Sequence, residues 1–88
     1  MNERGRKMRV PEGFERAFAE FQTVPNIGPA TAEDLVRLRI RGVRGLAGRD
    51  PIAMYRRLCR LDGVRHDPCV LDVFMAAVDF AETGSRRP

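Results

Sequence analysis

Apolar side chains recur at helical spacing along most of this 88-residue chain. A stripe with the i, i+3, i+4 and i+7 pattern predicts a helix over residues 13–22 whose aromatic rings lie in the core. Its members are Phe14, Ala17, Phe18 and Phe21. A second stripe predicts a helix over residues 29–39, and it consists of Ala32, Leu35, Val36 and Leu38. On this helix Glu33 and Arg37 have the spacing of an i,i+4 ion pair.

Two Asp-Pro pairs mark the starts of further helices, because aspartate caps a helix N-terminus and proline suits the first turn. Asp50-Pro51 opens a third helix, and Asp67-Pro68 opens a last helix that runs to about Glu82 before Gly84. A short helical turn is expected over residues 43–47. The last helix keeps its polar residues on one narrow stripe, so we expect it to be the most buried. The pattern predicts an all-α fold, a compact bundle of about five short helices.

Residues 23–32 read Thr-Val-Pro-Asn-Ile-Gly-Pro-Ala-Thr-Ala and predict a tight turn between the first two helices. Asn26 and Gly28 are residue types that tolerate left-handed backbone, and Ile27 between them is placed to fill the core. Such a turn leaves N–H groups free beside the positive end of the next helix, which favours a phosphate. The stretch therefore predicts a phosphate-holding hairpin.

These residues resemble the hairpin of helix-hairpin-helix proteins, in which a Gly-hydrophobic-Gly turn binds a DNA strand through its phosphates; Asn26 replaces the first glycine. The run over residues 40–46 resembles the C-terminal domain of TfoX-type bacterial competence regulators. Three later runs resemble the small bacterial "pathogenicity locus" family of helix-hairpin-helix proteins: Gly48-Arg49-Asp50-Pro51, Tyr55-Arg56-Arg57-Leu58-Cys59 and the stretch from Gly63 to Asp72. The resemblance covers about residues 14–82 and implies a SAM-like helix-hairpin-helix domain.

The resemblance implies DNA binding without sequence specificity, through contacts of residues 24–31 with the phosphate backbone. The expected contacts are hairpin N–H groups, a threonine hydroxyl and arginines that follow. The set is Asn26, Ile27, Gly28, Ala30, Thr31, Arg37, Arg39, Arg41 and Arg44. A monovalent cation at the hairpin carbonyls is an optional cofactor that the resemblance also implies. Many such hairpins carry Lys or Arg where this chain has Ala30, and Glu33 and Asp34 follow, so the alternative is a protein–protein interaction module.

The formal net charge of +4 is unevenly distributed. Residues 36–65 carry nine arginines against two aspartates, a net charge of +7, whereas residues 10–35 carry one arginine against five carboxylates. A basic middle suits a polyanion, because the arginine fork fits phosphate oxygens; a solvated basic face is the alternative. The third helix is predicted to bury one apolar face and to expose a basic ridge opposite it. The apolar face consists of Ile52, Tyr55, Leu58 and Cys59, and the basic ridge consists of Arg56, Arg57 and Arg60.

Cys59, His66 and Cys69 form the one constellation that invites a chemical role. A closed zinc site needs four ligands, and no Cys-x-x-Cys or His-x-x-x-His pair is present, so we expect no metal. A reactive thiol at Cys69 is a second interpretation, because a helix N-terminus favours thiolate. The preferred interpretation is that both cysteines are small structural residues. No serine nucleophile, carboxylate pair or cofactor loop indicates an enzyme.

Residues 11–83 are predicted to form a single helix-hairpin-helix domain between two disordered tails, residues 1–10 and 84–88. No apolar run is long enough to span a membrane, and the first residues lack the apolar centre of a signal peptide. We therefore expect a cytoplasmic protein whose partner is the DNA backbone, with no membrane contact and no small-molecule substrate.

Overall fold

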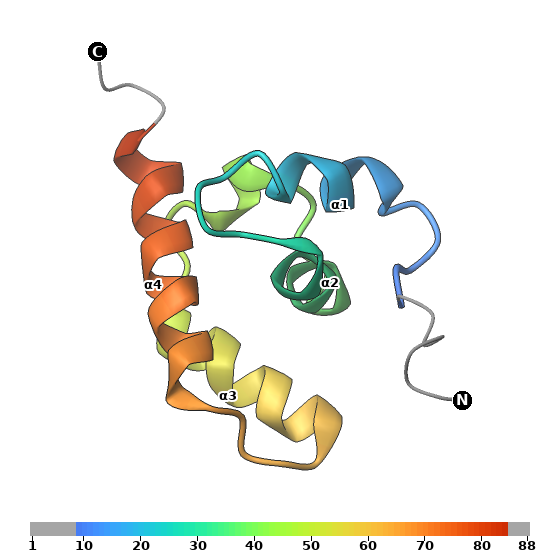
Figure 1. Ribbon diagram of the computed structural model, residues 1–88, viewed down its shortest axis with the longest axis vertical. Helices are drawn as coiled ribbons and strands as arrows, with labels where there is room; N and C mark the ends of the chain where they lie inside the picture. The colour runs from blue at the N-terminus through green and yellow to red at the C-terminus, as the bar shows by residue number, and fades with distance from the viewer. Residues whose placement is uncertain (1–8, 85–88) are drawn as a thin grey trace.

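A computed structural model describes residues 9–84, which form an all-helical domain (Figure 1). Its elements are α1 (Glu15–Phe21), α2 (Pro29–Arg37), the 3₁₀ helix η1 (Val43–Leu46), α3 (Pro51–Asp62) and α4 (Pro68–Thr83). Within these residues there is no strand, which confirms the all-α prediction. Four α-helices and one 3₁₀ turn are present, so the expected count of five helices is not confirmed. No helix in the described range has the length and apolar character needed to cross a membrane.

Both Asp-Pro signals start a helix where the sequence predicts it. The carboxylates of Asp50 and Asp67 each accept a hydrogen bond from the N–H two residues further on, at 3.0 and 2.8 Å. These bonds satisfy N–H groups that the helix itself leaves unpaired. The starts of α3 and α4 are therefore fixed by local chemistry.

The most buried helix is α2, and the prediction that α4 is the central one is wrong. α2 buries four of its nine residues, and α4 buries three of sixteen. These are Ala32, Glu33, Leu35 and Val36 in α2, and Phe74, Ala77 and Val78 in α4. In Figure 1 the first half of α4 extends beyond α2 with α3 beside it. Apolar residues in that half therefore have a packing partner on one side, which leaves Val70, Leu71 and Val73 half-buried.

The domain consists of two helix pairs joined through η1. α1 packs against α2, α3 packs against α4, and η1 contacts both α1 and α4 (Figure 1). Met54 and Leu58 form the buried face of α3. Of the predicted apolar face, Leu58 is buried as expected, whereas Tyr55 and Cys59 are half-buried and Ile52 is 48% exposed.

The chain that precedes α1 packs against α2. The backbone N–H of Arg9 donates to the Glu33 carboxylate at 2.5 Å, and Val10 packs against the core. The spacing of Glu33 predicted an ion pair with Arg37. In the structure Glu33 pairs with Arg9 instead. Residues 9 and 10 belong to the folded domain, which corrects the predicted boundary of the first tail. The rest of that tail, and residues 85–88 of the second, lie outside the described residues.

Candidate nucleic-acid interface

Residues 22–28 form the tight turn between α1 and α2. Asn26 has left-handed backbone with φ 71°, and the Ile27 side chain is buried, as the sequence predicts. Gly28 has φ −97° and ψ −171°, and a Cβ added there would meet no atom within 4 Å. Gly28, which the sequence singles out with Asn26 as suited to left-handed backbone, therefore does not adopt that conformation. The left-handed residue that turns the chain is Asn26.

The start of α2 offers hydrogen-bond donors. The N–H groups of Gly28, Ala30 and Thr31 have no hydrogen-bond partner among residues 9–84. The N–H of Ile27 is not available to a ligand, because it donates to the carbonyl oxygen of Val24 at 3.1 Å. An anion could therefore accept hydrogen bonds at this end of α2, from fewer groups than the sequence predicted.

The hollow beside the hairpin is acidic. It has a volume of about 330 Å³ and lies between the hairpin and the C-terminal half of α4. Its lining consists of Val24, Pro25, Asn26, Ala76, Asp79, Phe80, Thr83 and Gly84. Asp79 is the charged side chain in that lining, and its carboxylate repels a phosphate. The hairpin thus offers donors without the positive charge that a nucleic-acid strand requires.

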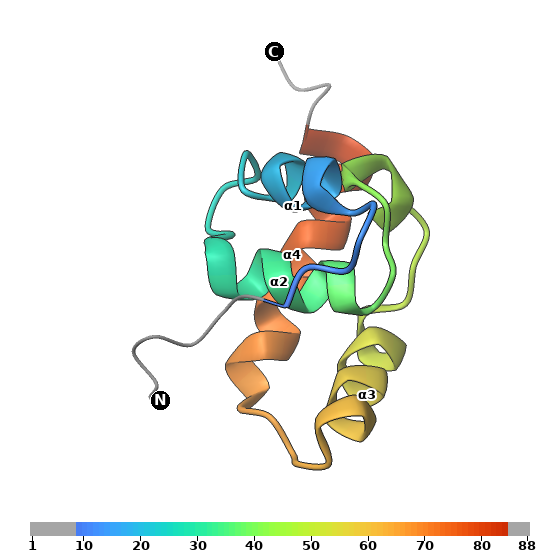
Figure 2. The same cartoon turned by 90° about the vertical axis from the view of Figure 1, so that its right-hand side faces the viewer.

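The predicted arginines lie away from the hairpin. Arg37, Arg39 and Arg41 come at or after the C-terminal end of α2, and the length of that helix separates them from the hairpin by about 12 Å. Figure 2 shows residues 22–28 and 38–42 at opposite ends of α2, with η1 on the side of residues 38–42. Arg44, in η1, is exposed. The nine predicted site residues therefore do not form one surface.

A Schellman motif ends α2 and places two arginines in solvent. The N–H of Arg39 donates to the Val36 carbonyl at 2.9 Å, and the N–H of Ile40 to the Leu35 carbonyl at 3.3 Å. This motif requires left-handed backbone after the helix cap, which is usually supplied by glycine. Here Arg39 supplies it, with φ 66°. Ile40 is buried while Arg39 and Arg41 are exposed.

Four arginines around residues 38–41 are held by contacts within the protein. The guanidinium carbons of Arg41 and Arg39 lie 4.4 and 5.7 Å from the centre of the Phe14 ring. Arg57 donates to the Leu38 carbonyl at 3.2 Å, and Arg49 donates to the Gly45 carbonyl at 2.7 Å. Arg49 and Arg57 also line one hollow with Leu38 and Ile40. We call Arg39, Arg41, Arg49 and Arg57 the arginine face. Asp50 lines the same hollow, but its carboxylate caps α3.

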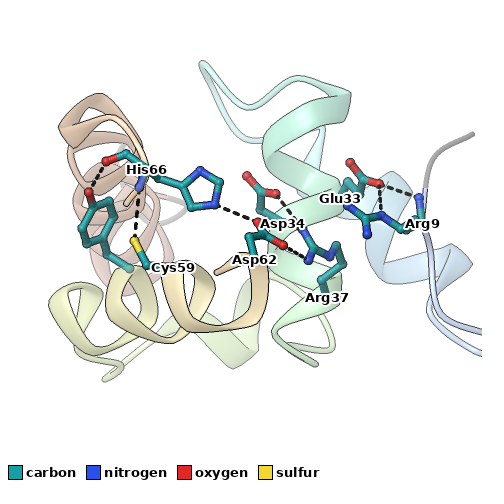
Figure 3. A network of polar contacts seen from close by, with 8 residues as sticks. Arg9, Glu33, Asp34, Arg37, Cys59, Asp62 and His66 are labelled. Atoms are coloured by element: carbon teal, nitrogen blue, oxygen red, sulfur yellow. Dashed lines mark hydrogen bonds and ion pairs between the residues drawn. The ribbon is translucent and has the colours of Figure 1, made fainter. Parts of the chain in front are cut away.

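Arg37 is part of a polar clasp that joins α2 to the end of α3 (Figure 3). Its guanidinium donates to both carboxylate oxygens of Asp62 and lies 3.7 Å from Asp34. Asp62 also contacts the ring of His66 at 2.7 Å. Only 14% of the Arg37 side chain is exposed. The Arg37 guanidinium is therefore used by contacts within the fold and is poorly placed for the predicted contact with phosphate.

The clasp shifts its two carboxyl groups in opposite directions. Hydrogen bonds from Arg37 lower the pKa of Asp62 to about 2. Burial raises the pKa of Asp34 to about 6, against the opposing effect of Arg37. A perturbed carboxyl group can mark a catalytic site. Here every member of the clasp faces another member, so the arrangement is that of a structural ion-pair network.

Cys59, His66 and Cys69 do not converge. The Cys59 sulfur accepts the backbone N–H of His66 at 3.3 Å, whereas the His66 ring contacts Asp62. Cys69 is exposed, and a hydrogen bond and charge from Asp67 raise the pKa of its thiol. This shift disfavours thiolate and therefore argues against a reactive thiol at Cys69. Among the described residues no three His, Cys, Asp or Glu side chains lie close enough to hold a metal ion. The expected absence of a metal remains a prediction.

Sequence reasoning did not find the role of Phe14 or the placement of Arg49 and Arg57. Phe14 belongs to the apolar stripe of α1, and no local signal indicates that its ring supports two guanidinium groups. The alternation of Leu38, Arg39, Ile40 and Arg41 between apolar and charged residues is a signal that could have identified an exposed arginine pair.

Residues 15–88 match the protein family described as "Pathogenicity locus" (Cdd1). The chain is also similar to the mitomycin resistance protein McrB of Streptomyces lavendulae, with 39% identity over 70 residues, which are 80% of this chain and 67% of that protein. No solved structure gives a significant match to the chain. The family match includes all four α-helices and η1. The chain therefore belongs to the Pathogenicity locus (Cdd1) family.

Proposed function

We propose that this protein binds the phosphate backbone of nucleic acid without reading base sequence. The observation that carries the proposal is the arginine face, in which four exposed arginines surround residues 38–41 and each is held by a contact within the protein. Guanidinium groups fit phosphate oxygens in a bidentate manner. Contacts with phosphate position a protein on nucleic acid but carry no base information, so no sequence preference is expected.

The fixed positions of these arginines favour binding. A free arginine side chain loses conformational freedom when it binds, and this loss weakens the association. The ring of Phe14 supports Arg39 and Arg41, and backbone carbonyls hold Arg49 and Arg57. Part of the conformational entropy of these arginine side chains is therefore lost on folding, so less is lost when they bind a phosphate. Both arginines beside Phe14 keep donors for a phosphate, because a contact with an aromatic ring uses no N–H group.

We assign α1, residues 22–28 and α2 to a helix-hairpin-helix motif, related to that of TfoX-type regulators, in a cytoplasmic DNA-binding protein. The support is the helical flanks, the left-handed Asn26 and the free N–H groups of Gly28, Ala30 and Thr31. The acidic hollow makes the hairpin a secondary contact. A monovalent cation there would lower the repulsion by Asp79. Thr31 is half-buried and can add its hydroxyl.

The test is the salt dependence of binding to duplex and single-stranded DNA, measured by fluorescence anisotropy. Each phosphate contact contributes a slope of roughly −0.9 to log K against log salt concentration for duplex DNA. The double variant Arg39→Gln and Arg41→Gln should therefore bind more weakly, with a slope that is shallower by about 1.8 for duplex DNA. The matched variant with lysine at both positions keeps the charge and should keep the slope.

Gly28→Val tests the hairpin separately, because a Cβ at position 28 meets no atom and the variant should fold. We expect a smaller loss of affinity than from the double arginine variant. If Gly28→Val removes binding while the glutamine variant binds normally, the hairpin and not the arginine face is the contact surface. A flat salt response of the unmodified protein would contradict the proposal as a whole.

The second candidate function is a protein–protein interaction module. Four large apolar side chains are about half exposed, which is the observation that favours it. They are Ile52, Leu61, Val64 and Met75. Under this function DNA binding would be absent and the charge variants would leave partner capture unchanged, so the same anisotropy series separates the two candidates.

A further inference from the structure

A groove of about 570 Å³ lies at the C-terminal end of α3. None of its lining residues belongs to the arginine face or to the hairpin. The last two turns of α3 form one wall and the following loop forms the other. Its lining consists of Tyr55, Arg56, Cys59, Arg60, Gly63, Val64 and Arg65. A volume of this size is typical of sites for small ligands or single chemical groups.

The walls of the groove are fixed in place by hydrogen bonds. Gly63 has left-handed backbone, and the N–H of Val64 donates to the Cys59 carbonyl at 3.2 Å. The Tyr55 hydroxyl donates to the carbonyl of His66, whose own N–H donates to the Cys59 sulfur. The loop is therefore bonded to α3 on both sides of the groove. The groove is shallow and open to solvent, and its shape is present without a ligand.

The lining combines apolar surface with positive charge. Tyr55 contributes an aromatic ring, and Val64 is an exposed apolar side chain, 55% accessible to solvent. Arg56 and Arg60, one helical turn apart, and Arg65 from the loop contribute three guanidinium groups. The lining contains no carboxylate. Such a groove is suited to a ligand that has a flat or apolar part and a negative charge beside it.

Exposed arginines of α3 belong both to the arginine face and to this groove. Arg39 lines a hollow with Leu61, which is the neighbour of Arg60 on α3. Successive residues of a helix are about 100° apart, so Arg57, Arg60 and Arg56 follow one another around the solvent side of α3. Arg57 contacts the Leu38 carbonyl, and the other two line the groove. A single strand bound to the arginine face can therefore continue into the groove along a series of arginines.

We propose that this groove holds an unpaired base of a single nucleic-acid strand, and that the protein therefore prefers single-stranded to duplex nucleic acid. This inference rests on the proposed function. A base has a π-face that stacks on an aromatic ring or a guanidinium plane, and its phosphate provides the charge that the three arginines attract. Duplex DNA keeps its bases stacked inside, and turning one outward costs a few kcal/mol. A duplex would use the arginine face and leave the groove empty.

The first experiment compares an oligothymidylate with an abasic oligonucleotide of the same length and charge. A stacked base typically contributes about tenfold in affinity, so we expect the oligothymidylate to bind about tenfold more tightly. Equal affinities would overturn the inference and leave the proposed function intact. If neither oligonucleotide binds with a salt-dependent affinity, the proposed function fails first.

Two matched variants locate the contact. Val64→Asp places a carboxylate in the groove, and Ile52→Asp makes the same change at an exposed apolar residue of α3 outside the groove lining. Val64→Asp should remove the tenfold preference for the oligothymidylate, whereas Ile52→Asp should keep it. Circular dichroism checks that both variants fold. Equal behaviour of two folded variants would contradict a base in this groove.

Cys59 provides a readout at the groove itself. In a Cys69→Ser background Cys59 is the remaining thiol, and its rate of alkylation reports access to the groove. The oligothymidylate should slow alkylation several-fold, and the abasic oligonucleotide should slow it less. Equal protection by inorganic phosphate at matched ionic strength would show a site for simple anions and overturn the proposal.

Discussion

Arg39 occupies a backbone position that a residue with a side chain disfavours. Left-handed backbone costs an L-residue roughly 1 kcal/mol relative to glycine, and glycine is the usual residue at this point of a Schellman motif. Arg39 adopts this unfavourable backbone conformation, and its exposed side chain lies with that of Arg41 against the ring of Phe14. A strained residue in solvent is a sign of a functional requirement for that side chain. At this scale the arginine face is more informative than the hairpin.

The prediction at this scale is that Arg39→Gly separates stability from binding. Glycine accepts φ 66° without strain, while the contact with Phe14 is lost, so the free energy of unfolding should stay the same or rise by up to about 1 kcal/mol. The affinity for DNA should fall because one charge is lost. Urea denaturation and anisotropy on the same protein measure both quantities. A variant that is destabilised by more than 1 kcal/mol would show that the contact with Phe14 outweighs the backbone strain.

Individual residues were predictable from sequence where the local chemistry decides their conformation. The two aspartate caps are examples, because the hydrogen bonds they make lie within two residues. The left-handed Asn26 is another, because asparagine tolerates this backbone conformation. Arg37 was not predictable. Its partner Asp62 is 25 positions away in sequence, and helical spacing indicated only the local pair with Glu33.

At the scale of elements, the clasp between α2 and α3 has one favourable and one unfavourable carboxylate. Asp62 is stabilised as an anion by Arg37, and its contribution is present above pH 4 and lost as pH falls toward 2. Asp34 is half-buried beside Glu33 and Asp62, and its anion is disfavoured. Above pH 6 the folded protein therefore contains an ionised Asp34, although its surroundings favour the neutral carboxylic acid.

This difference predicts how stability depends on pH. The pKa of Asp34 is about 6 in the fold and about 4 in the unfolded chain. Between these values the fold binds more protons, so the free energy of unfolding should decrease as pH rises from 4 to 6. Asp34→Asn should remove this dependence and stabilise the protein at pH 7 by an amount on the order of 1 kcal/mol. Urea denaturation at several pH values tests this. A less stable variant at pH 7 would show that the ion pair with Arg37 outweighs the burial of the charge.

The existence and order of the elements could be predicted, but their burial could not. The periodicity of α4 is apolar on most sides, which indicated a central helix. That reasoning assumes that other elements pack against α4 on every side. The first half of α4 packs mainly on one side, against α3, so Val70, Leu71 and Val73 there stay half-buried. The short α2 became the most buried helix because α1, the N-terminal segment and the clasp all contact it.

At the scale of the whole molecule, the arginine face and the free amide donors of the hairpin lie on different parts of the fold. Residues 22–28 and 38–42 lie at opposite ends of α2 (Figure 2), and the arginine face is built around the second of these segments. Under the proposed function, two separate contact surfaces would let the protein bind two strands, or two parts of one strand. The sequence predicted one surface that combines the hairpin with Arg39 and Arg41, and their separation depends on the tertiary fold.

The attachment of the α3–α4 pair has a consequence for native-state dynamics. α3 packs chiefly on α4, and its connection to α2 includes the polar clasp and the bond from Arg57 to Leu38. Polar contacts of this kind open at lower free energy than an apolar core, so α3 and the first turns of α4 should undergo sub-global opening as one unit while α1 and α2 remain closed. Amide hydrogen exchange followed by NMR should then show one shared, lower protection free energy across α3 and the highest protection at Leu35 and Val36. Because the groove belongs to the unit that opens, a strand held there should slow exchange throughout α3.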